Sequence, residues 1–135
     1  MAALSVHHIG VAVGDLDEAV RVWSDLFGAA VEHRETLEEQ GVEAVSLRTG
    51  SGRVELLAPL GPDTPVGRFL AKRGPGMHHV AFEVADVAAE LERLRRGGTQ
   101  LIDEEPRRGL FGLQVAFVHP EATGGVLAEL VADGS

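Results

Sequence analysis

The chain has 135 residues, 44% of them hydrophobic, which is enough for one well-packed domain and too little for two ordinary ones. Its 12 basic and 21 acidic residues give a formal net charge of −9, which argues against nucleic acid as a partner because phosphate neutralisation requires a basic surface. The absence of cysteine excludes disulfides and thiolate metal sites, so a bound metal would need imidazole and carboxylate ligands.

No stretch approaches the roughly 18 to 20 apolar residues of a membrane helix. The N-terminal "MAALSVHH" lacks the basic start and the apolar segment of a signal peptide. We therefore expect a soluble, cytoplasmic protein that does not associate with membranes.

The first half of the chain predicts a β-α-β-β-β succession over about residues 5–60. Residues 6–13 alternate between a bulky aliphatic face and a face with His8, Gly10 and Ala12. A helix is expected from an acidic cap at Asp15 to Gly28, because apolar residues recur between them at helical spacing. Three short strands are expected over 29–37, 42–50 and 52–60. A bridging helix follows over about 63–73, with Asp63 or Thr64 as its cap.

The second half repeats this order over about residues 76–132. A strand over 77–84, a helix over 86–98 and a strand over 99–103 precede a Pro/Arg/Gly-rich loop over 104–112. Two strands over 113–120 and 124–133 complete it. His79 lies 71 positions after His8, and Asp86 lies 71 positions after Asp15. The two halves therefore indicate a tandem duplication.

The expected fold is α+β. Two tandem βαβββ modules would form one curved, cup-like mixed sheet with helices outside, in a single domain spanning 1–135. Such sheets present edges and helix faces suited to self-pairing, so we also expect a homodimer.

Four polar residues occupy repeat-related positions, namely His8, Glu55, His79 and Glu129. Each belongs by period-two counting to the strand face opposite the aliphatic side chains, whereas His7 and His78 fall on the other face and His33 is expected at the surface. A single histidine at a strand start is more often structural than a ligand. A glutamate within an apolar buried strand, however, needs a cation, hydrogen bonds or solvent. If the duplicated modules bring the four together, they match a divalent first-row metal, and cobalt, nickel, manganese, zinc and iron are all admissible.

Several long segments carry a family resemblance: "HHIGVAVGDLDEAV", "ELLAPLGPDTPVGRFLAKRGPGMHHVAFEV", "LIDEEPRRG" and "FVHPEATGGVLAEL". They resemble the methylmalonyl-CoA epimerases of the vicinal oxygen chelate (glyoxalase) superfamily over nearly the whole chain. The resemblance implies that His8, Glu55, His79 and Glu129 bind a divalent metal, commonly cobalt. It also implies interconversion of (R)- and (S)-methylmalonyl-CoA, by proton abstraction and return at the α-carbon through an enolate that the metal chelates.

Inversion requires a proton removed from one face and returned on the other, most simply by two carboxyl groups. Some members of the family place the base at the second residue after the valine of "EQGV". In this chain that position is Ala44, and the acid stands one residue earlier, at Glu43. A shift of one residue in a strand reverses the face, so Glu43 reaches the site only if the strand begins with a bulge. Glu43 and Glu129 are the catalytic candidates, with Glu55 or a metal-bound water as alternatives.

Coenzyme A would require a local basic patch on an acidic protein. The candidates for contacts with its phosphates are Arg68, Lys72, Arg73, Arg107 and Arg108, and His119 is a further candidate for contact with the substrate.

Two alternative functions remain open: a glyoxalase-type isomerase that acts on a hemithioacetal, and a metal-free small-molecule-binding module of the same fold. The ligand set allows the glyoxalase-type isomerase equally well, whereas the retention of all four polar positions argues against the binding module.

Overall fold

The computed structural model describes residues 3–133, which group into two compact units. The N-terminal unit is His8–His78, and the C-terminal unit combines residues 3–7 with 79–133. Within the described residues, no helix has both the length and the apolar character needed to cross a membrane.

The N-terminal unit is built on a mixed sheet with the strand order β2-β3-β4-β1. The pairs β2–β3 and β3–β4 are antiparallel, whereas β1 and β4 run parallel. The elements that lie wholly or mostly in this unit are β1 (Ser5–Ala12), α1 (Leu16–Phe27), β2 (Ala30–Leu37), a 3₁₀ turn (Glu38–Gln40), β3 (Val42–Thr49), β4 (Gly52–Pro59) and α2 (Pro65–Arg73). The predicted strands and helices of the first half are all confirmed.

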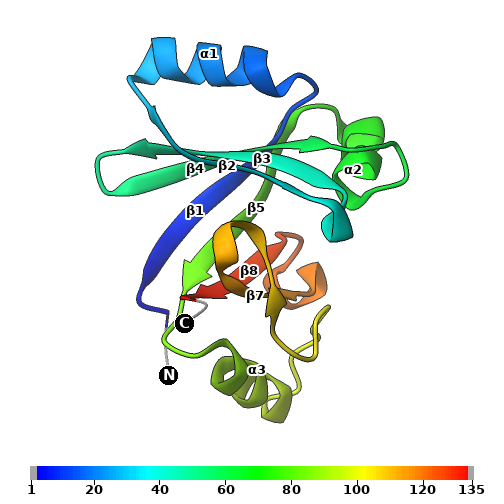
Figure 1. The fold of residues 1–135 in the computed structure, drawn as a ribbon. Helices are drawn as coiled ribbons and strands as arrows, with labels where there is room; N and C mark the ends of the chain where they lie inside the picture. Colours follow the sequence, from blue (N-terminus) through cyan, green and yellow to red (C-terminus); the bar gives the residue numbers. More distant parts are fainter. Residues whose placement is uncertain (1–2, 134–135) are drawn as a thin grey trace. The chain divides into compact units, whose positions relative to one another are not determined.

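Helix α1 begins and ends at the predicted signals. The Asp15 carboxylate accepts a hydrogen bond from the Glu18 backbone N–H, and Gly28 ends the helix in the left-handed conformation with φ 65°. The apolar side of α1 packs on one face of the sheet, as Figure 1 shows. The core between them contains Val11, Val13, Leu16, Ala29, Val45, Leu47, Leu56 and Ala58, with Trp23 packed against it.

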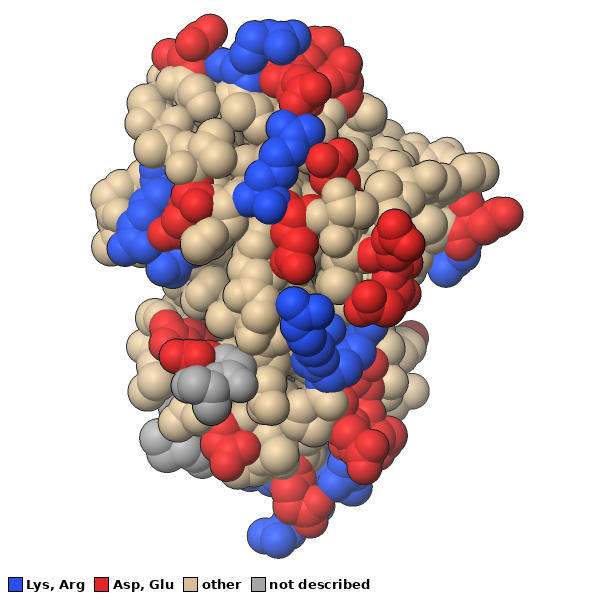
Figure 2. All heavy atoms as spheres, in the orientation of Figure 1, with Lys and Arg blue, Asp and Glu red and all other residues tan. Residues whose placement is uncertain are grey.

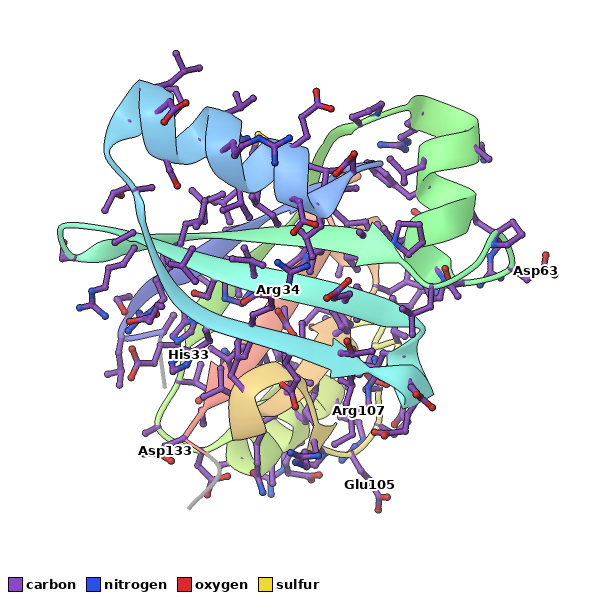
Figure 3. The ribbon with its side chains drawn as sticks, turned by 45° about the horizontal axis from the view of Figure 1, so that its top comes forward. His33, Arg34, Asp63, Glu105, Arg107 and Asp133 are labelled. Atoms are coloured by element: carbon purple, nitrogen blue, oxygen red, sulfur yellow. The ribbon has the colours of Figure 1, made fainter. Side chains whose placement is uncertain are left out.

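Helix α2 follows a turn in which Thr64, not Asp63, provides the cap. The Thr64 hydroxyl accepts a hydrogen bond from the Gly67 backbone N–H, and Pro65 occupies the first turn. The Asp63 side chain projects outward at the tip of the preceding loop (Figure 3).

The C-terminal unit repeats this plan with the strand order β5-β8-β7-β6. Here β5 and β8 are parallel, and β8–β7 and β7–β6 are antiparallel. Helix α3 is capped by the Asp86 carboxylate, as predicted, and packs on one face of the sheet (Figure 1). The elements are β5 (Gly76–Glu83), α3 (Val87–Arg96), β6 (Arg107–Arg108), a 3₁₀ turn (Leu110–Gly112), β7 (Gln114–Val118), a 3₁₀ turn (Pro120–Thr123) and β8 (Ala128–Ala132).

The prediction of a strand over 99–103 is wrong. This segment makes an isolated bridge between Leu101 and Val118 and a few backbone hydrogen bonds with Phe117 and His119, but no regular ladder. The cause is the Asp103 side chain, whose Oδ2 accepts a hydrogen bond of 2.8 Å from the Phe117 backbone N–H. A side-chain acceptor thus replaces the backbone carbonyl that a ladder would use, and regular pairing does not develop.

Candidate active site

The first histidine–glutamate pair lies in the N-terminal unit, where β1 runs parallel to β4. Glu55 is directly opposite Gly10, and His8, two residues before Gly10, shares its face of the sheet. The Nε2 atom of His8 lies 3.4 Å from Oε2 of Glu55. Both residues are only 3% exposed, so the pair is withdrawn from bulk water.

The second pair repeats this arrangement in the C-terminal unit. Glu129 is directly opposite Ala81, two residues after His79, so the register matches that of the first pair. The Nε2 atom of His79 lies 3.1 Å from Oε1 of Glu129, and the two residues are 6% and 7% exposed. The His79 ring also meets the Phe117 ring nearly edge to face, with centroids 5.6 Å apart.

The faces that carry the two pairs differ sharply from the opposite faces. Small residues line the strands beside the histidines, namely Gly10 and Ala12 in β1 and Ala81 in β5, and all of them are buried. The opposite faces carry the aliphatic cores that pack on α1 and α3. His78 lies on the side away from His79 and packs edge-on against Phe69 of α2, with ring centroids 5.0 Å apart. We call the pair-bearing side of each sheet its inner face.

The donor chemistry of each pair fits a divalent metal. Each pair offers an imidazole nitrogen and a carboxylate oxygen, which are common ligands of first-row metals such as zinc and cobalt. A carboxylate buried as deeply as that of Glu55 is costly unless it is paired or coordinates a cation. These residues can therefore contribute to a metal site, although the donor types do not select one metal.

Glu43, the first catalytic candidate, lies on the other face of the sheet. The β3–β4 register is unbroken from Val42 to Thr49, so the strand contains no bulge that would turn Glu43 inward. Its neighbour Ala44, which is 0% exposed, occupies the inner face instead. Oε2 of Glu43 accepts a hydrogen bond of 3.1 Å from Nε of Arg34, which also bonds Asp17 of α1. This placement argues against Glu43 as a proton-transfer group.

Glu32 was not singled out by the sequence, yet it forms a charge cluster with two arginines in the N-terminal unit. It accepts hydrogen bonds from Arg48 (2.8 Å), Arg53 (3.0 Å) and the Ser46 hydroxyl (3.3 Å). The bond from Arg48, with a further contribution from Arg53, lowers the pKa of Glu32 from 4.5 to about 2. Glu32 occupies a β-bulge between Val31 and His33, and a bulge has no clear signature in the sequence.

Three of the predicted coenzyme A contacts lie on α2. Arg68, Lys72 and Arg73 are exposed, and the Arg73 guanidinium lies 5.8 Å from the centroid of the Phe69 ring. Nη1 of Arg68 donates a hydrogen bond to the Asp63 carbonyl. On the face shown in Figure 2, basic and acidic side chains are interspersed, so no broad basic surface is formed there.

The other predicted substrate contacts lie in the C-terminal unit. Arg107 and Arg108 form the short strand β6 and are exposed. The Arg107 guanidinium stacks over the Phe117 ring at 5.7 Å, which places it on the same inner face as His79 and Glu129. Nδ1 of His119 accepts a hydrogen bond of 3.0 Å from the Glu121 backbone N–H, so this ring caps a 3₁₀ turn.

A family model matches residues 7–117, and it describes the glyoxalase/bleomycin resistance protein/dioxygenase superfamily. The chain belongs to this superfamily. The methylmalonyl-CoA epimerase of Mus musculus is 40% identical over 93% of the chain and 71% of its own length. The ethylmalonyl-CoA/methylmalonyl-CoA epimerase of Cereibacter sphaeroides is 34% identical over 93% of the chain and 95% of its own length.

A solved methylmalonyl-CoA epimerase in complex with methylmalonyl-CoA and NH4+ is also similar, with a TM-score of 0.95 and 39% identity. The match covers 99% of this chain and 97% of the other. A similarity of this extent confirms the predicted α+β fold of the superfamily. These relatives are epimerases, a class of isomerase, as the sequence resemblance implied.

Proposed function

We propose that this protein is a metal-dependent epimerase that interconverts (R)- and (S)-methylmalonyl-CoA. The observation that carries the proposal is the pair of buried histidine–glutamate contacts at equivalent register in the two repeats. Similarity to methylmalonyl-CoA epimerases over almost the whole chain supports this choice of substrate.

The residues proposed to hold the metal are His8, Glu55, His79 and Glu129. A divalent ion bound there would act as a Lewis acid toward the oxygens of the thioester and the carboxylate, with cobalt as the first candidate and manganese, nickel or zinc as alternatives. The imidazoles and carboxylates of the chain would supply neutral and anionic ligands in a region largely withdrawn from water.

The chemical task of the remaining residues is proton transfer at the carbon between the thioester and the carboxylate. One group accepts the α-proton from one face, and another returns a proton to the opposite face. Glu129 remains a candidate for one of these groups. Arg68, Lys72, Arg73, Arg107 and Arg108 are proposed contacts for the anionic substrate, and His119 is proposed to contact it from the turn after β7.

The decisive experiment follows the α-proton of methylmalonyl-CoA in deuterated water with purified, cobalt-loaded protein. Deuterium should enter the α-position, and the two epimers should interconvert. No exchange with either epimer would contradict the proposal. Formation of lactoylglutathione from the hemithioacetal would instead indicate a glyoxalase-type isomerase, and metal content near zero in active protein would contradict the metal site.

We also propose that the protein works in the cytoplasm as a homodimer.

A further inference from the structure

The inner face of the N-terminal unit carries two arginines that the sequence did not single out. Ser46 of β3 is directly opposite Glu55 of β4. Two residues along β3, Arg48 is directly opposite Arg53 of β4. Side chains two residues apart on a strand point to the same side of a sheet. Arg48 and Arg53 therefore share the inner face with Glu55.

Glu32 joins the two arginines into one cluster on this face. Its Oε1 accepts hydrogen bonds from Nε of Arg53 at 3.0 Å and from the Ser46 hydroxyl at 3.3 Å. Its Oε2 accepts a hydrogen bond of 2.8 Å from Nη1 of Arg48. Like charges directly opposite each other on paired strands repel, and the carboxylate relieves this repulsion. Two guanidinium groups share one carboxylate, so the cluster keeps an excess of positive charge.

The cluster borders the first histidine–glutamate pair. Ser46, which bonds Glu32, is directly opposite Glu55. Arg53 and His8 each directly precede the first residue pair of the parallel β1–β4 ladder. Neighbouring strands lie about 4.8 Å apart, so a small ligand held at the His8–Glu55 pair would have the cluster within one or two strands on the same face.

Arg53 keeps hydrogen-bond donors for a ligand. A guanidinium carries N–H groups on Nε, Nη1 and Nη2 and stays charged at neutral pH. Nε of Arg53 donates to Glu32, and within residues 3–133 its two Nη atoms donate no hydrogen bond. Arg48 is held at two points, because its Nη1 bonds Glu32 and its Nε bonds the Gly50 carbonyl in the β3–β4 turn. The Arg53 side chain is 25% exposed, so a ligand can reach it.

We propose that Arg53 recognises the free carboxylate of the substrate. This inference rests on the proposed function, because that carboxylate distinguishes methylmalonyl-CoA from propionyl-CoA. The fork of a guanidinium matches a carboxylate in shape and in charge. Glu32 is a positioning residue, because it holds Nε and leaves the Nη atoms for the ligand. The positive charge also offsets the negative charge that develops beside the carboxylate as the α-proton leaves.

The test measures the affinities of cobalt-loaded wild type and Arg53→Met for methylmalonyl-CoA and for propionyl-CoA by isothermal titration calorimetry. Wild type should prefer methylmalonyl-CoA. The variant should lose about 10-fold or more of its affinity for methylmalonyl-CoA, the usual effect of losing hydrogen bonds to a charged group. Its affinity for propionyl-CoA should change by less than about threefold. A distorted site would weaken both ligands alike, so the ratio of the two affinities isolates the contact with the carboxylate.

Two further variants control for charge and for folding. Arg48→Met removes the same charge from the same cluster, and its ratio of affinities should stay within about threefold of wild type. Arg53→Lys keeps the charge but lacks the fork, so its ratio should lie between those of wild type and Arg53→Met. If circular dichroism shows Arg53→Met to be unfolded, Arg53→Lys provides the comparison with wild type, and an unchanged ratio in it overturns the inference.

Three other results would also overturn the inference. They are a wild-type protein without preference for methylmalonyl-CoA, a ratio in folded Arg53→Met within about threefold of wild type, and an equal loss of the ratio in Arg48→Met. The proposed function has its own outcome. Wild type that shows the preference but neither exchanges the α-proton nor epimerises refutes the epimerase activity, whereas recognition of the carboxylate by Arg53 is then still supported by the loss in Arg53→Met.

Discussion

His79 and Glu129 are buried so deeply that the Glu129 carboxylate requires a polar partner. A carboxylate at this depth needs a nearby donor or cation, and the imidazole of His79 stands 3.1 Å from it. The same relation holds for His8 and Glu55. If these groups bind a metal, replacing His8 or His79 should weaken metal binding far more than replacing the adjacent histidine, His7 or His78.

His79→Ala should therefore abolish metal binding and activity while the protein remains folded, because this residue lies on the inner face and not in the aliphatic core. The loss of cobalt affinity should exceed the 10- to 100-fold typical of residues that only support a ligand. Isothermal titration with cobalt measures the affinity, and circular dichroism checks the fold.

His78→Ala is the matched control, because it removes the same side chain from the opposite side of β5. This substitution should lower the free energy of unfolding, because the contact with Phe69 is lost, while cobalt affinity stays at the wild-type level. Equal cobalt affinity in both variants would remove His79 from the metal site.

The positions of the histidines and glutamates could be predicted from the sequence because duplication and strand alternation are both visible there. Each of the two histidines is in contact with a glutamate of its own unit. The bulge at Glu32 and its contacts with Arg48 and Arg53 could not be predicted in this way. Which strand lies beside which, and in what register, depends on pairing between distant segments, and a single sequence does not encode it openly.

The N-terminal caps of α1 and α3 are equivalent elements of the two repeats. Asp15 and Asp86 each accept a hydrogen bond from the backbone N–H three residues later. Asp15→Ala and Asp86→Ala should each lower the free energy of unfolding by about 1 kcal/mol. Urea titrations would measure this, with Asp25→Ala, which is exposed on α1, as a control expected to change little.

The Glu32 cluster links β2 to β3 and β4, and it predicts that the stability of the protein depends on pH. The pKa of Glu32 is lowered in the folded protein, so its contribution to stability is complete above pH 4.5 and is lost as the pH falls toward 2. Glu32→Gln should cost about 1–2 kcal/mol at pH 7, since partial exposure weakens these ion pairs.

The pH dependence can be checked by urea unfolding of Glu32→Gln and wild type between pH 7 and pH 3. The difference between their unfolding free energies should shrink steadily below pH 4.5. A difference that stays constant over this range would show that the arginines do not stabilise the ionised form.

The irregular segment over 99–103 could not be predicted either, because its structure also depends on contacts between distant parts of the chain. This segment has the composition of a strand, but the Asp103 carboxylate accepts a hydrogen bond from a backbone N–H of β7. Whether a side chain competes successfully with a carbonyl depends on the distance between two segments, which composition does not reveal.

On the scale of the whole molecule, the repeat is the organising feature. The β1–β4 and β5–β8 pairs are both parallel and place a glutamate opposite the residue two positions after a histidine. His8→Ala should therefore impair cobalt binding to a degree similar to His79→Ala.

We expect the protein to form a homodimer, because sheet edges and helix faces offer surfaces for self-association. Sedimentation equilibrium should give twice the chain mass of 14.3 kDa at micromolar concentration. A mass equal to one chain at all concentrations would contradict this expectation.

The single extra residue in β2 separates two stretches of the β2–β3 ladder that differ in register by one residue. From His33 to Leu37 the pairing continues without interruption to the end of the strand, with Arg34 on the helix side and Glu35 on the inner side. Deleting Glu32 should therefore close the bulge and leave both of these orientations unchanged. The deletion would remove the carboxylate that accepts hydrogen bonds from Arg48 and Arg53, so these two arginines would lose their shared anion.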